Sequence, residues 1–478
     1  MGFTYIDLFA GIGGFHAALS ALGGECVFAS EIDADAVKVY ERNWSVAASQ
    51  TGAPSGRVQG DIREFAPPDG EVTVPAHDVL VAGFPCQPFS KSGAQQGVRD
   101  KARGTLYFNI LRVLEERRPS LVLLENVRNI AGPRHRDTWR TIIATLREAG
   151  YKVSDEPTVF SPHLLPPELG GTPQVRDRVF IAGVYVGPER AQEETDVPPV
   201  LERAPVGDWN PDHWDIARTK LAVADGAPLL LDDDEIPNLE DYRLSPSEMR
   251  WIEAWNDFVE RMWEAREGQR LPGFPLWRDH WVHLDELEIE PDTPAWKRDF
   301  LLKNSRFYTE HQHAIDAWLK DWDDLEDFPP SRRKLEWQAQ DTPRLWDCIL
   351  HMRPSGIRAK RPTYVPALVA ITQTSIIAQR GRRLTTREAA RLQGLPDWFD
   401  FGDQREALTY RQLGNGVAVG VVYHVLRELV CQLGSDVPRP VAQAILASPD
   451  APEIEQGCQP ELPLLELQSS DEIAVAAG

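Results

Sequence analysis

The 478-residue sequence predicts an α/β protein with a doubly wound, mostly parallel sheet and a smaller domain inserted into the chain. Three observations carry this prediction. Short apolar segments typical of buried strands alternate with helical segments up to about residue 188. This alternation stops in residues 189–347, which are rich in Trp, Pro and acidic residues. Helical patterns then return from about residue 384.

The composition limits the class of protein. The five cysteines are scattered and form no C-x-x-C pair, which argues against a disulfide framework or a zinc site and for a reducing compartment. No segment resembles a signal peptide, and no run approaches the roughly 20 apolar residues that a membrane span needs. We therefore expect a cytoplasmic protein with no metal site and no membrane contact.

The charge is unevenly distributed. The net charge is −22, which by itself argues against a nucleic-acid partner. Residues 348–387, however, contain no Asp or Glu and form a basic strip. Its members are Arg353, Arg358, Lys360, Arg361, Arg380, Arg382, Arg383 and Arg387. An acidic protein with one basic strip suits a polyanion bound on one face.

A glycine-rich turn follows the first predicted strand, residues 3–9, and precedes a predicted helix over residues 15–22. Gly11 and Gly13 would let the backbone approach a ligand closely. Glu31 follows the next strand, residues 26–29, where an acid typically binds ribose hydroxyls. The spacing differs from G-x-G-x-x-G, so the turn favours a nucleoside ligand without pyrophosphate. The alternative is a tight turn with no ligand.

Cys86 follows a short apolar strand predicted over residues 79–82. Pro85 and Pro88 flank the thiol and prevent a helix there, which predicts a stiff loop at a strand end. Ligands of open α/β sheets bind at that edge. The alternative is a buried, inert cysteine.

Two further acids are candidate site residues. Glu125 ends the strand predicted over residues 120–124 and is expected in the same crevice as Cys86, while Asn126 beside it could act as a cap. Asp61 could accept a hydrogen bond from an adenine amino group, or could cap a helix.

The remaining elements follow from periodicity and caps. Helices are predicted over residues 106–116, 136–149, 246–267, 311–321, 385–393 (with Thr385 or Thr386 as cap) and 417–432, and strands over residues 178–185 and 364–372. The aromatic residues Trp251, Trp255 and Phe258 recur at helical spacing, which indicates a core rather than a stacking platform. We expect the acidic tail from Ser435 to be disordered, docked at most through residues 462–467.

Taken in order, these motifs resemble those of cytosine-C5 DNA methyltransferases. The resemblance covers residues 1 to about 187 and 383–432. The matching stretches are Asp7-Leu8-Phe9-Ala10-Gly11-Ile12-Gly13-Gly14-Phe15, Glu31 with Asp33, Gly60-Asp61-Ile62, Gly83-Phe84-Pro85-Cys86-Gln87-Pro88-Phe89-Ser90, Arg103-Gly104-Thr105-Leu106, Glu125-Asn126-Val127, Gln174-Val175-Arg176-Asp177-Arg178, residues 384–396 and Gln412-Leu413-Gly414-Asn415-Gly416-Val417.

The resemblance implies the Rossmann-like fold of methyltransferases that use S-adenosyl-L-methionine (AdoMet). Residues 1–188 would form the catalytic domain and 189–383 the target-recognition region. Residues 384–434 would end that region and return to complete the cofactor pocket. The implied cofactor-binding residues are Phe9, Gly11, Gly13, Glu31, Ile32, Asp61, Pro85, Leu106 and Asn415. Ile32 departs from the aromatic residue that many members place there to pack on adenine.

The implied chemistry starts from the poor nucleophilicity of cytosine C5. Addition of the Cys86 thiolate to C6 would push electron density into the ring. Glu125, with a pKa raised by burial, would donate to N3. Arg176 and Arg178 lie one residue apart on a strand approach and so face opposite ways. By family position we assign the base O2 to Arg178, with Arg176 in support. The cytosine must leave the duplex for this reaction.

The resemblance implies duplex DNA as partner, a bacterial or phage source and a monomeric enzyme. It is compatible with a restriction partner, a phage-defence system or a stand-alone regulatory modifier. Expected DNA contacts are Ser90 and, around a loop at Arg353-Pro354-Ser355-Gly356, the residues Arg353, Arg358, Lys360 and Arg361. The alternatives are a tRNA cytosine-C5 methyltransferase and a catalytically silent DNA-binding homologue. A nicotinamide or flavin oxidoreductase has no use for the Pro-Cys-Gln loop.

Overall fold

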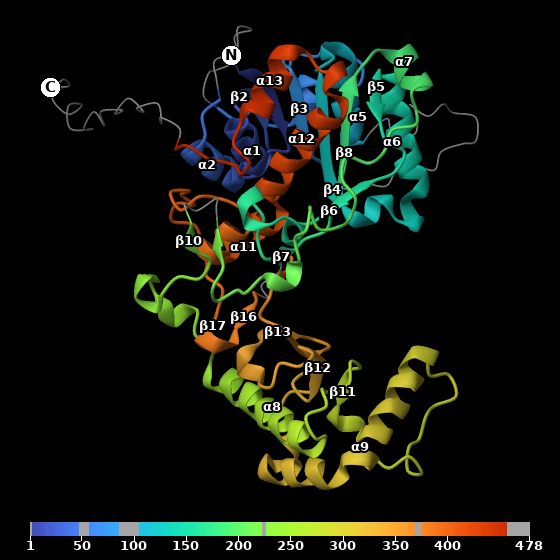
Figure 1. Cartoon of the computed structure of the whole chain (residues 1–478), viewed down its shortest axis with the longest axis vertical. Coiled ribbons are helices and arrows are strands. Elements are labelled where there is room, and N and C mark those ends of the chain that lie inside the picture. The colour runs from blue at the N-terminus through green and yellow to red at the C-terminus, as the bar shows by residue number, and fades with distance from the viewer. Residues whose placement is uncertain (1, 47–56, 86–104, 222–225, 369–373, 457–478) are drawn as a thin grey trace, which may run out of the picture.

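The computed structural model describes residues 2–46, 57–85, 105–221, 226–368 and 374–456, arranged as two lobes (Figure 1). The N-terminal and C-terminal parts of the described chain form the first lobe. The segment between them forms the second.

The first lobe is built on a seven-stranded sheet in the order β2-β1-β3-β4-β8-β5, with β6 also paired to β8. Its strands are β1 (Phe3–Leu8), β2 (Gly24–Ser30), β3 (Val79–Gly83), β4 (Leu121–Val127), β5 (Tyr151–Val153), β6 (Thr158–Phe160) and β8 (Arg178–Tyr185). The first four are parallel, and β8 runs antiparallel to β4. The predicted fold class, a mostly parallel α/β sheet, is therefore confirmed.

Helices cover both faces of this sheet. The helices of the first lobe are α1 (Gly14–Ala21), α2 (Ala34–Asn43), α3 (Ile62–Phe65), α5 (Leu106–Arg117), α6 (Arg136–Glu148), α7 (Pro188–Glu193), α11 (Glu406–Asn415), α12 (Val419–Leu433) and α13 (Arg439–Ala447). Because strand side chains alternate, Tyr5 joins the core under α1 and α12 while Ile6 joins the core under α5 and α6. The sheet is thus doubly wound.

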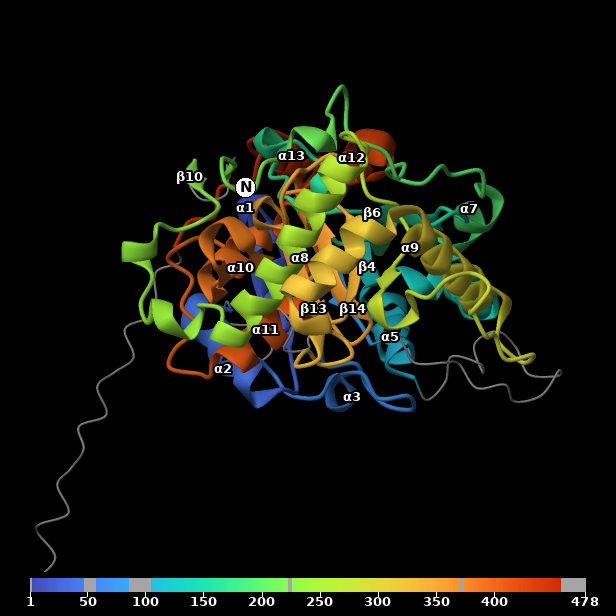
Figure 2. The same cartoon turned by 90° about the horizontal axis from the view of Figure 1, so that it is seen from below.

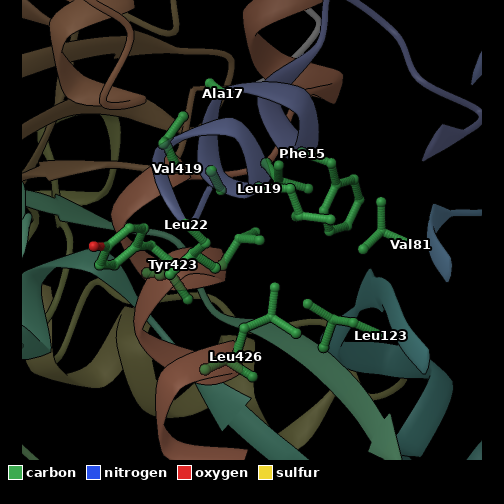
Figure 3. Close-up of a cluster of buried hydrophobic side chains, with 14 of the residues drawn as sticks. Phe15, Ala17, Leu19, Leu22, Val81, Leu123, Val419, Tyr423 and Leu426 are labelled. Atoms are coloured by element: carbon green, nitrogen blue, oxygen red, sulfur yellow. The ribbon is translucent and has the colours of Figure 1, made fainter. Parts of the chain in front are cut away.

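Helix α12 returns to the first core from the far end of the sequence. Its residues Val419, Tyr423 and Leu426 pack with Phe15 and Leu19 of α1, as Figure 3 shows. In the part of the chain that the structure describes, one helical stretch, Glu406–Asp436, is long and apolar enough to cross a membrane, but 72% of its apolar window is buried. Its apolar composition therefore reflects a place in the core.

The prediction of a disordered tail from Ser435 is wrong for residues 435–456. Helix α13 packs through Val441 and Ile445 onto the first core. Pro438 and Pro440 obscured this helix in the sequence, yet they stand at its start, where proline is tolerated. The predicted docking segment, residues 462–467, lies outside the described residues.

The second lobe has its own six-stranded sheet in the order β11-β12-β14-β13-β16-β17. The strands are β11 (Leu276–Trp277), β12 (Lys334–Gln338), β13 (Ile349–Arg353), β14 (Gly356–Lys360), β16 (Ile376–Ile377) and β17 (Arg382–Arg383). Helices α8 (Pro246–Ala265) and α9 (Ala295–Asp321) cover one face through a core that contains Trp255, Phe258 and Trp318. Of the three aromatic residues predicted to lie in a core, Trp255 and Phe258 are buried there, and Trp251 is partly buried against it.

Two expectations for the second lobe need correction. Helix α9 begins at Ala295 rather than near His311, where its backbone is kinked. The predicted strand over residues 364–372 is reduced to β15 (Val365–Pro366), and residues 369–373 lie outside the described chain. The first lobe also extends beyond residue 188, because α7 and residues such as Val197 and Val206 pack on its core.

Several contacts join the lobes. β15 pairs with β7 (Gln174–Val175), and β9 (Lys220–Leu221) pairs with β10 (Ala227–Pro228) nearby. Helix α10 (Thr386–Leu392) starts at the N-cap Thr385, which forms a capping box with Glu388. Glu388 in turn accepts from the fully buried Arg382 at 2.9 and 3.0 Å. Removing one partner of such a pair typically costs about 3–5 kcal/mol.

Close packing of α12 gives the first testable prediction. A Cβ at Gly420 would lie 2.0 Å from the carbonyl oxygen of Gly170, a backbone atom. We expect Gly420→Ala to lower the free energy of unfolding by about 1–3 kcal/mol, as overpacked cores do. Gly434→Ala is the matched control, because its Cβ would meet only Val430 Cγ1 at 3.7 Å. Urea unfolding followed by circular dichroism measures both, and equal midpoints would contradict the prediction.

Candidate active site

A cavity of about 800 Å³ opens at the carboxyl ends of β1, β2, β3 and β4, the edge where open α/β sheets bind ligands. Residues 411–417, at the end of α11 and the start of the connection to α12, close its other side. Of the predicted site residues, those that line it are Phe9, Gly11, Glu31, Ile32, Asp61, Pro85, Leu106, Glu125, Arg178 and Asn415.

The glycine-rich turn forms one wall. Phe9 and Gly11 adopt left-handed backbone conformations, with φ of 59° and 55°. Phe9 is a non-glycine residue, so its positive φ marks a strained position of the kind found at ligand sites. Gly13, predicted as a cofactor residue, does not line the cavity. A Cβ there would lie 2.1 Å from Trp44 Nε1, so this glycine serves the packing of Trp44.

Glu31 organises the wall beside the turn. Its Oε2 accepts from Gly11 N at 2.9 Å, and its Oε1 accepts from Ile32 N and Asp33 N at 2.8 Å. A carboxylate has about four acceptor positions, so one remains for a ligand hydroxyl. The Ile32 side chain is 73% exposed on the same wall and is free to pack on a planar group.

The structure favours the capping alternative for the Asp61 carboxylate. It caps α3 by accepting from Arg63 N at 3.0 Å, and it forms an ion pair with the Arg63 guanidinium. This side-chain contact lowers the pKa of Asp61. Asp61 nevertheless lines the cavity, together with Arg63, which sequence reasoning did not single out.

The segment that leads to the predicted nucleophile is braced by Asn126. The Asn126 Nδ2 donates to the carbonyl oxygen of Phe84 at 2.8 Å, which fixes the chain one residue before Pro85. Phe84 and Pro85 both line the cavity. Cys86 and Ser90 lie outside the described residues.

Glu125 is buried at the end of β4, where it pairs directly with Gly83 of β3. Its Oε1 lies 3.0 Å from Arg178 Nε. Burial raises the pKa of Glu125, and the charges of Arg178 and Arg176 oppose this shift. A buried carboxyl beside an arginine, with one side open to the cavity, can hold or release a proton there.

Arg178 starts β8, whereas Arg176 lies before that strand, so strand alternation does not set the directions of the two side chains, and the charges of both act on Glu125. The Arg176 guanidinium is fully buried and donates to the carbonyl oxygens of Leu368 at 3.2 Å, Gly414 at 2.8 Å and Gly416 at 2.5 Å. Burial lowers the pKa of Arg176 to about 9, so it stays charged at neutral pH. It thereby fixes the segment that closes the cavity.

An ion pair that sequence reasoning missed spans the cavity wall. Arg411 Nη2 lies 3.1 Å from Asp33 Oδ2, while Asp33 Oδ1 caps α2. Both residues line the cavity. The only signal in the sequence was the position of Arg411 directly before the 412–417 motif.

The expected DNA contacts lie in the second lobe, on a β-hairpin rather than on the predicted loop. Arg353 ends β13, Arg358 and Lys360 lie on β14, and Arg361 follows it. The Pro354-Ser355 turn joins the two strands. The pairing is local, and apolar residues (Leu350, Met352, Ile357 and Ala359) alternate with polar ones on both sides of the turn, a hairpin signal that the interpretation of this segment as a loop overlooked.

Comparison with known proteins identifies relatives. The family model for C-5 cytosine-specific DNA methylase matches residues 3–431. Type II methyltransferase M.AluI of Cellulosimicrobium cellulans is 47% identical over 495 residues, covering 90% of this chain and 92% of that protein. Type II methyltransferase M.BanI of Aneurinibacillus aneurinilyticus is 29% identical over 456 residues, covering 90% and 96%. The crystal structure of S. pombe Dnmt2 methyltransferase has a TM-score of 0.42 at 15% identity, covering 90% and 99%.

The contact between Glu125 and Arg178 gives the second prediction. Arg178 lowers the pKa of Glu125 against the effect of burial. Arg178→Ala should therefore raise this pKa further, while Arg178→Lys, which keeps the charge, should raise it less. Infrared difference titration of the carboxyl band, assigned with Glu125→Gln, measures the shift. An unchanged or lowered pKa in Arg178→Ala would show that the ion pair does not set the protonation of Glu125.

Proposed function

This chain belongs to the C-5 cytosine-specific DNA methylase family, and on that basis we propose that it methylates C5 of a flipped-out cytosine within a specific duplex DNA sequence, through a covalent Cys86–C6 intermediate. The observation that carries the proposal is the buried Glu125, paired with Arg178 on a cavity wall that leads along Gly83–Pro85 to Cys86.

The cavity fits AdoMet, the methyl donor of this family. Glu31 has an acceptor position left for ribose hydroxyls, and the exposed Ile32 offers an apolar surface to adenine. The residues that would hold the cofactor are Phe9, Gly11, Glu31, Ile32, Asp61, Pro85, Leu106 and Asn415. When bound, AdoMet supplies an electrophilic methyl group.

Cys86 is assigned as nucleophile. Its thiolate forms an Sγ–C6 bond with cytosine and moves the ring electrons toward C5. Once C5 had bonded to the methyl group that AdoMet would supply, loss of the C5 proton to solvent, return of the N3 proton to Glu125 and cleavage of the Sγ–C6 bond would restore the aromatic ring and the thiolate. The other described cysteines do not line the cavity, and burial raises the pKa of Cys26 to about 12 and also raises the pKa of Cys348. Reactivity requires the thiolate, so these two thiols are unsuited to the role.

Glu125 is assigned as the acid at cytosine N3. Its raised pKa favours the protonated form that donates to N3 as negative charge builds on the ring. We assign the base O2 to Arg178, and its position 3.0 Å from Glu125 on the same wall supports this role. Arg176 acts in support, as a positioning residue that holds residues 414–416 in place.

Duplex DNA is the proposed substrate, because the family acts on DNA and the second lobe provides a separate surface beside the cavity-bearing lobe. Extrusion of the cytosine costs a few kcal/mol of unstacking. The type II methyltransferases among the relatives support a role within a restriction–modification system, and we propose a monomeric enzyme. Methyl transfer from labelled AdoMet to duplex DNA rather than tRNA tests this substrate against the tRNA alternative.

The third prediction concerns the nucleophile. Cys86→Ala should abolish methylation while AdoMet affinity stays near wild type, because the thiol acts on the base and not on the cofactor. Mass spectrometry of a duplex that contains 5-fluorocytosine should find the wild-type enzyme bound covalently, and the variant free.

Cys431→Ala is the matched control, since this exposed thiol lies on α12 outside the cavity. The Cys431→Ala variant should form the covalent adduct with the 5-fluorocytosine duplex as the wild-type enzyme does. An adduct that maps to Cys348 or Cys431 would overturn the assignment of Cys86.

The fourth prediction separates the two strand-end acids. Glu125→Gln should lower the methylation rate by orders of magnitude with little change in AdoMet Kd, because Glu125 acts in the transition state. Glu31→Ala should instead weaken AdoMet binding by about 1–3 kcal/mol through lost hydrogen bonds, with Glu31→Gln intermediate. Calorimetry and single-turnover rates measure the two effects. Equal loss of AdoMet binding in both would refute this division of roles.

A further inference from the structure

The sheet of the second lobe has one apolar face and one polar face. Leu350, Met352 and Ile357 point into the core under α8 and α9. The alternate positions carry polar side chains on neighbouring strands, with His351 opposite Arg358 and Glu336 beside Arg358. We call this the polar sheet face; its residues are Glu336, Gln338, His351, Arg353, Arg358 and Lys360.

The polar sheet face is turned toward the first lobe. Ile349 and Ile377 share its side of the strands, and they pack with Leu384 and Leu392 in the cluster that joins the lobes. Figures 1 and 2 agree, since α8 lies on the side of the sheet away from the first lobe. His163, a residue of the first lobe, has a pKa lowered to about 4, mainly by burial. The charge of Asp177 opposes this shift, and the charges of Arg203 and Lys360 add to it. Lys360 therefore lies within electrostatic reach of that lobe.

The cations on and beside this hairpin differ in whether they have an ion-pair partner. Arg361 is paired with Asp212, with Nη1 3.6 Å from Oδ2. Arg353 and Lys360 have no ion-pair partner among the described residues, and burial together with the neighbouring cations lowers both pKa values. Three cations thus share one carboxylate, Glu336, on a half-buried face. Such a face favours an anionic or acceptor-rich partner.

Arg358 is held in a fixed orientation. Its Nε and Nη2 both lie 2.6 Å from Glu336 Oε2, and Glu336 Oε1 accepts from Ser355 Oγ at 3.0 Å. A guanidinium has a second edge, formed by Nη1 and Nη2. In the described structure Nη1 has no hydrogen-bond partner, so this edge is available. Two parallel N–H groups match the O6 and N7 acceptors of guanine in the major groove.

We propose that Arg358 reads a guanine of the target sequence, with Glu336 as its positioning residue and Arg353 and Lys360 as flanking phosphate contacts. This inference rests on the proposed action on duplex DNA. His351, opposite Arg358 on the same face, is 94% buried; its Nε2 contacts Ser375 Oγ at 2.8 Å, and its Nδ1 has no hydrogen-bond partner in the described structure. Unpartnered buried polar atoms are rare in folded proteins.

The test compares full-length variants on defined DNA. Sequencing of a plasmid library methylated by the wild-type enzyme first establishes the target. Single-turnover methylation is then measured on duplexes that carry each other base, or 7-deazaguanine, at each guanine of that target in turn. Arg358→Ala should lose about tenfold to hundredfold discrimination at one guanine and keep its preference elsewhere. The 7-deaza duplex at that position should slow the wild type but not Arg358→Ala, because the variant no longer has the guanidinium that donates to N7.

Glu336→Gln and Arg358→Lys should lose discrimination partly at the same guanine, and they keep the test valid should Arg358→Ala fold poorly. The matched control is Arg344→Ala, which removes an arginine–glutamate pair (Arg344 Nε to Glu260 Oε1, 3.3 Å) on the α8 side of the lobe. It should leave every preference unchanged. Unchanged preference in Arg358→Ala, Arg358→Lys and Glu336→Gln would overturn the inference, as would uniformly weaker binding with a lower salt slope, which marks a phosphate contact. Either result leaves the proposed function intact, whereas a wild-type enzyme that methylates no DNA would refute the proposed function itself.

Discussion

The buried guanidinium of Arg176 connects three segments that are far apart in the sequence. It lies just before β8 and donates to the carbonyl oxygens of Leu368, Gly414 and Gly416. Leu368 packs in the core of the first lobe, Gly414 lies in the last turn of α11, and Gly416 directly follows that helix. Each of these carbonyls would cost roughly 1–3 kcal/mol if buried without a partner. The insertion of a whole lobe into the chain is therefore compatible with a closed cavity, because one charged side chain satisfies both returning segments.

The same region places opposing electrostatic effects on one carboxyl group. Burial disfavours ionised Glu125, while Arg178 at 3.0 Å and the charge of Arg176 favour it. The net effect is a raised pKa, so burial is the stronger influence. A group in this balance responds to small changes in its surroundings, such as the entry of a neutral base or the arrival of negative charge on that base. This sensitivity is what acid catalysis near neutral pH requires.

The first lobe could be predicted because its strands are continuous apolar runs and its site residues follow them directly, so one edge of a parallel sheet collects them. Local contacts that compete for a side chain could not be predicted: Asp61 is held by Arg63 two residues away, and Gly13 is required by Trp44. Helix α11 has no strong amphipathic signal, since buried Thr409, Leu413 and Gly414 are small or isolated. The second lobe depends on strand pairs fixed by tertiary contact, which local periodicity does not encode.

The basic strip is continuous in the sequence, but the folded structure divides its residues into paired and unpaired cations. Most of its members are committed to structure, through ion pairs with acids or hydrogen bonds to carbonyls: Arg361, Arg380, Arg382, Arg383 and Arg387. The uncommitted positive charge is concentrated on the polar sheet face. Exposed acids farther away contribute little to the electrostatic potential at this face, because salt screens exposed charges beyond about 8–10 Å under physiological conditions. A net charge of −22 is thus compatible with binding a polyanion, since the potential at the binding face depends on the charges within that distance.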